Sequence, residues 1–135
     1  MNAEFLKIKI DEQKKNIIII GNSFDLLDIV EIFLYKSYNV ITAIDEFDGM
    51  QKIKHFNPIC VFVKTNDNIS PVLAFMDKNM IVKNFGIPVI AFTKDKIMAI
   101  NELALKNSGI REIIKFPINQ QDFLAVIQPI INIIK

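Results

Sequence analysis

The stretch Pro58-Ile59-Cys60-Val61-Phe62-Val63-Lys64 decides the fold that this sequence predicts. An uninterrupted apolar run with β-branched residues is typical of a strand that is buried on both faces, as in a parallel sheet. The proline before the run closes the preceding segment. We therefore expect residues 59–63 to form a central strand with helices packed on both of its sides.

Four further apolar runs predict the remaining strands, at residues 16–20, 40–44, 87–92 and 110–115. Between them, apolar residues recur at the spacing of amphipathic helices. The predicted helices span residues 24–37, 45–56, a less sharply bounded segment within 71–84, 95–107 and 119–135. Ser23 is expected to cap the first helix, and Asn119 with Asp122 resembles a capping box for the last.

This alternation of strands and helices predicts an α/β fold. Parallel strands need crossover connections, and right-handed crossovers place helices on both faces of the sheet. We expect a flavodoxin-like, three-layer α/β/α sandwich whose five-stranded parallel sheet has the order 2-1-3-4-5. Residues 16–135 form this one domain, and residues 1–15 are an N-terminal extension that is either an edge strand or a tail.

Composition limits the classes of function. The chain has 135 residues with 51% apolar composition and a formal charge of +1, so it lacks the basic footprint of a nucleic-acid-binding protein. Its apolar runs are too short to span a bilayer, and we expect a soluble protein without a membrane partner. One cysteine, Cys60, and one histidine, His55, predict no metal site and a reducing compartment, the cytoplasm.

From about Asn16 onward the chain resembles the receiver domains of response regulators in two-component signalling, in the chemotaxis-regulator-like form. The strand of residues 87–92 is followed by Thr93, where that family has a hydroxyl residue. Ser108-Gly109 is followed by a short strand and Pro117, which also fits the family pattern. The resemblance implies a site at the carboxyl ends of the strands, where the family is phosphorylated on an aspartate.

Three positions of that implied site lack the family's chemistry. Gly21 and Asn22 stand where the family has the acidic pair that holds Mg²⁺, and Lys64 stands where it has the phosphorylated aspartate. An amine cannot form the mixed anhydride that a carboxylate forms with a phosphoryl donor. We therefore expect a degenerate receiver, or pseudo-receiver, without Mg²⁺, cofactor or catalytic residues, and not an enzyme.

Two further positions of the degenerate phosphoacceptor pocket come from the resemblance. Thr93 matches the family's hydroxyl residue, although bulky Lys94 follows it. By spacing from Gly109, Phe116 with Pro117 matches the family's Lys-Pro, and the resemblance allows a cis peptide bond between them. Lys115 lies one residue earlier and remains the alternative occupant of the lysine position, if a bulge turns it toward the pocket.

The amine of Lys64 has two interpretations. It either pairs with a carboxylate such as Asp25, Asp45 or Asp67, or it forms a small anion site with the neighbouring polar groups. We favour the ion pair.

Signalling by phosphorylation-independent binding of a protein partner is the function that we expect from this pattern. One alternative is a phosphorelay receiver with an atypical acceptor carboxylate such as Asp67. Another is a small-anion or nucleotide sensor that uses the altered pocket.

The last predicted helix has more apolar residues than one face of a helix in a monomer is expected to bury. The family commonly pairs through its fourth helix, fifth strand and fifth helix. We therefore expect a partner or a homodimer to use that surface, and Pro129 to kink the helix or end it early. The interface residues that we expect on this helix are Phe123, Ile127, Ile130 and Ile134.

Overall fold

Four consecutive isoleucines in the first strand set the layers of the molecule. The computed structural model describes residues 10–22 and 24–132, and its first strand is β1 (Lys15–Ile20). Ile17 and Ile19 belong to one hydrophobic cluster, whereas Ile18 and Ile20 belong to another. Because successive side chains of a strand point to opposite faces, β1 is covered on both sides.

The sheet has the predicted topology. Its strands are β1, β2 (Tyr38–Ala43), β3 (Cys60–Lys64), β4 (Val89–Thr93) and β5 (Glu112–Lys115), all parallel and in the order β2-β1-β3-β4-β5. The predicted flavodoxin-like fold is confirmed. The register places Ile20 beside both Ala43 and Val63, so the ends of β2, β1 and β3 lie at one edge of the sheet.

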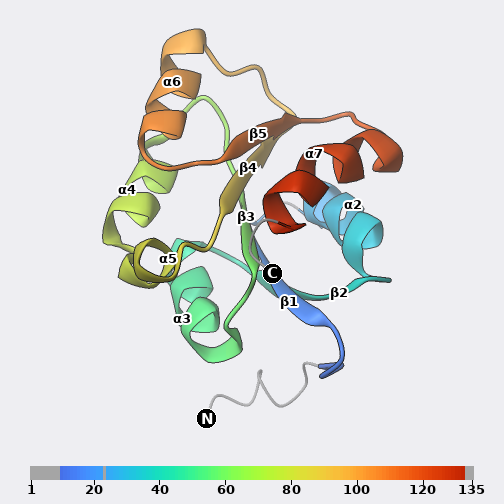
Figure 1. Ribbon diagram of the computed structural model, residues 1–135. Coiled ribbons are helices and arrows are strands. Elements are labelled where there is room, and N and C mark those ends of the chain that lie inside the picture. The colour runs from blue at the N-terminus through green and yellow to red at the C-terminus, as the bar shows by residue number, and fades with distance from the viewer. Residues whose placement is uncertain (1–9, 23, 133–135) are drawn as a thin grey trace.

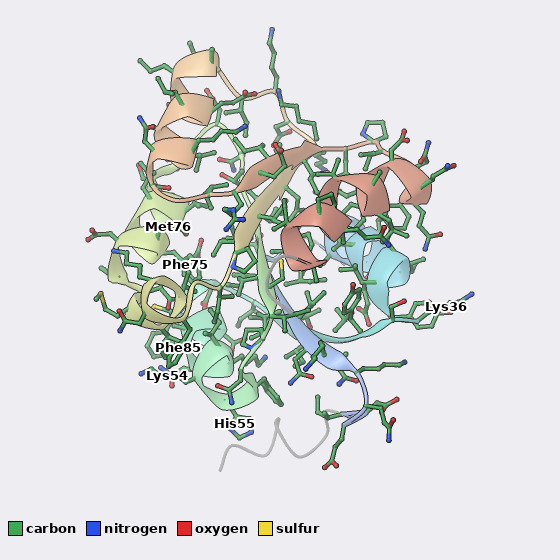
Figure 2. All side chains as sticks on the ribbon, viewed as in Figure 1. Lys36, Lys54, His55, Phe75, Met76 and Phe85 are labelled. Carbon is green, nitrogen blue, oxygen red and sulfur yellow. The ribbon has the colours of Figure 1, made fainter. Side chains whose placement is uncertain are left out.

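Helices cover both faces of this sheet (Figure 1). One face carries α2 (Phe24–Leu34) and α7 (Gln120–Asn132). The other carries α3 (Glu46–Phe56), α4 (Ser70–Lys78), α5 (Met80–Phe85) and α6 (Ala99–Asn107). Figure 2 shows Phe75 and Met76, both buried, on α4, whereas Lys36 projects outward from the opposite side of the molecule.

The prediction of a single helix within residues 71–84 is wrong, because the structure has two helices there. Asn79 separates them with a non-helical backbone, at φ −90° and ψ 85°. Its side-chain oxygen accepts a hydrogen bond from the backbone N–H of Val82 at 3.1 Å, which caps α5. The cap stabilises a non-helical backbone at Asn79, and the preceding helix therefore ends there.

The assignment of Phe123 and Ile127 to an interface is wrong. Both side chains are fully buried in the monomer, and the Phe123 ring contacts those of Phe33, Phe62 and Phe116 at centroid distances of 5.2, 5.8 and 6.2 Å. Residues four apart share one face of a helix, and α7 turns this face toward the sheet. The helix therefore buries these residues itself instead of presenting them to a partner.

The remaining expectations for α7 have mixed outcomes. Ile130 is half-buried and packs against the same cluster, and Ile134 lies outside the described residues. Pro129 does not end the helix, which continues to Asn132. The cap at Asn119 is confirmed, because its side-chain oxygen accepts a hydrogen bond from the N–H of Asp122 at 2.8 Å. Ser23, the expected cap of α2, also lies outside the described residues.

Cys60 is fully buried in β3, as expected for a core residue. Burial raises the pKa of its thiol far above the ordinary value, so the side chain stays protonated. No helix in the described part of the chain is long and apolar enough to cross a membrane.

Replacing the core phenylalanine tests the correction to α7. We expect Phe123→Ala to lower the free energy of unfolding by about 3–5 kcal/mol, because it leaves a cavity among three aromatic rings. Urea denaturation measures this change. In the control variant Leu103→Ala, which truncates an exposed side chain of α6, the change should stay within about 0.5 kcal/mol. Altered oligomeric state with unaltered stability in Phe123→Ala would instead restore the interface assignment.

Candidate functional site

A pocket of about 250 Å³ opens at the carboxyl ends of β1, β2 and β3. In open α/β sheets this is the region where ligands bind, next to the point at which the strand order reverses. The chain therefore has a cavity at the place where the sequence predicts its site. Its wall includes Gly21 and five residues with polar side chains: Asn22, Asp45, Glu46, Lys64 and Asn68.

Gly21 and Lys64 fit closely together at the floor of this pocket. A Cβ atom added to Gly21 would lie 2.9 Å from Lys64 Cβ and 2.9 Å from Leu27 Cδ1. Atoms at that separation overlap, so neighbouring residues would have to move. The lysine stem thus occupies space that the missing side chain at position 21 leaves open. The implied acidic residue at this position would not fit beside Lys64 without such a movement.

The prediction that Lys64 forms an ion pair with Asp45 or Asp67 is wrong. In the described part of the chain, Lys64 takes part in no ion pair. Asp45 caps α3, with its side-chain oxygen accepting a hydrogen bond from the N–H of Asp48 at 2.8 Å. The side chain of Asp25, the third candidate, lies outside the described residues. Lys64 therefore contributes a half-buried positive charge to the pocket.

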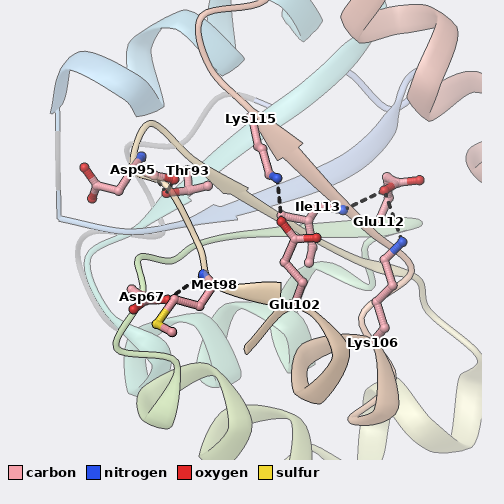
Figure 3. Close-up of polar contacts among 9 residues, drawn as sticks. All are labelled: Asp67, Thr93, Asp95, Met98, Glu102, Lys106, Glu112, Ile113 and Lys115. Carbon is pink, nitrogen blue, oxygen red and sulfur yellow. Dashed lines mark hydrogen bonds and ion pairs between the residues drawn. The ribbon is translucent and has the colours of Figure 1, made fainter. Parts of the chain in front are cut away.

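Asp67 is held by the loop that follows β4. Its carboxylate accepts hydrogen bonds from the N–H of Met98 at 2.9 Å and from the side-chain amide of Asn101 at 2.8 Å (Figure 3 draws the first). Met98 is the cap residue of α6 and supplies no side-chain cap of its own. Asp67 therefore caps this helix from another loop. The hydrogen bonds from Asn101 and then from Met98 lower the pKa of the Asp67 carboxyl group below its ordinary value.

Thr93 lies outside the pocket, although the sequence placed it there. Its side chain is fully buried, and the hydroxyl oxygen accepts a hydrogen bond from the N–H of Asp95 at 2.9 Å. The hydroxyl also donates to the carbonyl oxygen of Asp95 at 3.3 Å. A local turn therefore satisfies this hydroxyl group.

Lys115 and Phe116 are also not among the residues that line this pocket. Lys115 forms an ion pair with Glu102 of α6 (Figure 3). Phe116 is buried, with its ring 6.3 Å from that of Phe92. The Phe116-Pro117 peptide bond is cis, as the resemblance allowed. Neither residue brings an amine to the pocket, so the structure joins Gly21, Asn22 and Lys64 but not the other three predicted site residues.

Sequence reasoning named Asp45 only as a possible ion-pair partner of Lys64, and it missed Glu46, the other acidic residue after β2. Asp45 and Glu46 line the pocket together with Asn66 and Asn68 from the loop after β3. The signal was present, because a strand order of 2-1-3 places the end of the second strand beside the end of the first. The family pattern directed attention to strands one, three, four and five instead.

Solved structures of receiver domains share this fold. The chemotaxis protein CheY4 of Vibrio cholerae superposes with a TM-score of 0.74 at 16% identity, covering 86% of this chain and 98% of its own. A CheY-like receiver domain from Methanospirillum hungatei JF-1 gives a TM-score of 0.69 at 22% identity, covering 88% and 94%. NtrX from Brucella abortus, solved in complex with ADP, gives 0.74 at 18% identity, covering 89% of this chain and 27% of its own. No family model and no curated protein matches the sequence. The chain therefore has the fold of CheY-like response regulator receiver domains.

The Asp67 contacts predict a specific acid sensitivity. The folded-state pKa of Asp67 is lowered, so its stabilising contribution is fully present above the unfolded-state pKa and is lost as the pH falls through the folded-state value. We expect part of the loss of melting temperature below about pH 4 to come from this group. Melting curves recorded from neutral pH to strongly acidic pH should show a shallower fall in Asp67→Asn.

Asp77→Asn, which removes an exposed carboxylate of α4, is the matched control and should follow the wild-type curve. Identical acid profiles for wild type and Asp67→Asn would contradict the assigned role of Asp67.

Proposed function

We propose that this chain is a degenerate receiver domain of two-component-type signal transduction, which acts by binding protein partners without aspartyl phosphorylation. The observation that carries the proposal is Lys64, whose stem packs on Gly21 at the end of the central strand. That is the position at which the resemblance places the phosphorylated aspartate. A lysine there removes the nucleophilic carboxylate and puts a positive charge in its place.

The charges in the pocket also support a role without Mg²⁺. The ion prefers several anionic oxygen ligands in near-octahedral geometry. Gly21 and Asn22 offer no carboxylate, and one oxygen of Asp45 already caps α3. The ammonium group of Lys64 in the same pocket repels this divalent ion.

The contacts of Asp67 argue against its use as an atypical acceptor. Its carboxylate accepts hydrogen bonds from Met98 and Asn101, so it is turned toward the start of α6. Modifying the hydrogen-bonded oxygen would break the cap of that helix. A nucleotide is disfavoured for a different reason, since its phosphates would meet the carboxylates of Asp45 and Glu46.

For the interaction surface we propose α6 with β5, in place of the buried residues of α7. Three apolar side chains near the start of α6 are exposed, namely Met98 by 60%, Ile100 by 71% and Leu103 by 60%. Beside them, ion pairs join Lys115 to Glu102 and Lys106 to Glu112 (Figure 3).

A two-fold interface uses the same patch on both subunits, and this patch carries charges of both signs beside its apolar residues, so a second copy of the chain is the partner that we propose. The reduced thiol of Cys60 fits a cytoplasmic setting for this function.

Phosphorylation chemistry tests the main proposal. After incubation with acetyl phosphate and Mg²⁺, we expect the intact mass of the purified chain to stay unchanged, because no acceptor carboxylate stands at the end of β3. Mass spectrometry of the intact protein measures this, with a phosphorylatable receiver domain treated in parallel. A labile added phosphoryl group would overturn the proposal, and its loss in Asp67→Asn would identify that residue as the acceptor.

Sedimentation velocity over a range of concentrations tests the surface. We expect Ile100→Glu to weaken self-association by at least about tenfold, because it places a charge in an apolar contact. Ile32→Glu changes an isoleucine of α2 that is exposed by 60% and serves as the matched control. A wild-type chain that is monomeric at every concentration, or equal effects of both variants, would contradict pairing through α6.

A further inference from the structure

The pocket at the strand ends carries opposite charges on its two flanks. The order β2-β1-β3 places the acidic residues that follow β2 and Lys64 of β3 on either side of β1. Neighbouring strands lie about 4.8 Å apart, so the backbones of these two flanks are separated by about 10 Å. Gly21, at the end of β1, has no side chain to fill the interval.

The two flanks do not neutralise each other directly. Within the described residues, neither Lys64 nor Glu46 belongs to an ion pair, although both are half-buried at the pocket wall. Asp45 adds a second carboxylate on the acidic side. Half-buried charges that lack a partner are weakly compensated, and a molecule that carries both signs would satisfy both flanks at once.

The remaining wall limits the size and the polarity of such a molecule. Ile20, Ile44 and Val72 form an apolar part of the wall, and Asn22 and Asn68 contribute side-chain amides. The volume of about 250 Å³ lies below the range of sites for drug-sized ligands. The pocket therefore suits a small molecule with one short apolar group.

We infer that this pocket binds a small zwitterion with the chemistry of a free apolar amino acid. Its carboxylate would meet Lys64, its ammonium group would meet Glu46, and its side chain would lie against the apolar wall. Inorganic phosphate and nucleotides carry only negative charge, so they would leave the acidic flank without a partner. This inference goes beyond the proposed function and stands on the pocket alone, because it requires neither phosphorylation nor a protein partner.

Amide NMR titration of the intact chain tests the inference with L-valine, L-leucine and L-methionine as probes. We expect saturable shifts at Gly21, Asn22 and Lys64 in the millimolar range for at least one of them. For L-leucine, the matched analogues are 4-methylpentanoate, which lacks the ammonium group, and 3-methylbutylamine, which lacks the carboxylate. Each analogue should bind at least about tenfold more weakly, since it loses one charge-assisted contact.

Two variants test separately how the basic and the acidic side of the pocket contribute to binding. Lys64→Met and Glu46→Gln should each weaken amino-acid binding by at least about tenfold, whereas the surface controls Lys96→Met and Glu12→Gln should leave it unchanged. Melting temperatures without ligand verify that all four variants are folded. Absence of saturable shifts with all three amino acids, equal binding of the singly charged analogues, or binding that survives Lys64→Met would overturn the inference. The acetyl phosphate experiment is independent of these outcomes.

Discussion

Gly21 and Lys64 occupy neighbouring strand ends so closely that a Cβ atom on the glycine would overlap the lysine stem. The tight contact is with Lys64 Cβ, and the lysine Cδ lies 3.6 Å from the same point, so a side chain at position 21 would require its neighbours to move. The glycine also makes the pocket, because it leaves a floor without a side chain between the ends of β2 and β3. The chemistry available at the strand ends follows from that arrangement: an amine and two carboxylates around an open space.

Most of the fold was predictable because its three central strands, β1, β3 and β4, have buried apolar residues on both faces. Runs such as residues 16–20 and 59–63 have few alternatives to a buried parallel sheet, and the helical segments between them specify the crossovers. The boundary at Asn79 was harder to predict. A single asparagine ends one helix and caps the next there, and the apolar periodicity on either side of it continues without a visible break.

The site was predictable only in part, for reasons that differ between residues. Gly21, Asn22 and Lys64 meet because strand order alone brings their backbones together. Thr93 sits at a strand end as expected, but its hydroxyl group is satisfied within its own turn. Which face of α7 points outward depends on which of its apolar residues pack against the sheet. Composition therefore could not show that Phe123 and Ile127 point inward.

Asp67 lies between Asn66 and Asn68, which line the pocket, and its carboxylate holds the first residues of α6. The pocket wall and the exposed apolar start of α6 are therefore joined by one short hydrogen-bonded bridge. Two sites that share a structural element are energetically coupled when either ligand changes the geometry of that element. Reciprocity then follows from thermodynamics: a molecule in the pocket that alters binding at α6 must have its own affinity altered by the same factor when α6 is occupied. Under the two proposals above, a ligand in the pocket and a partner at α6 would lie at the two ends of this bridge.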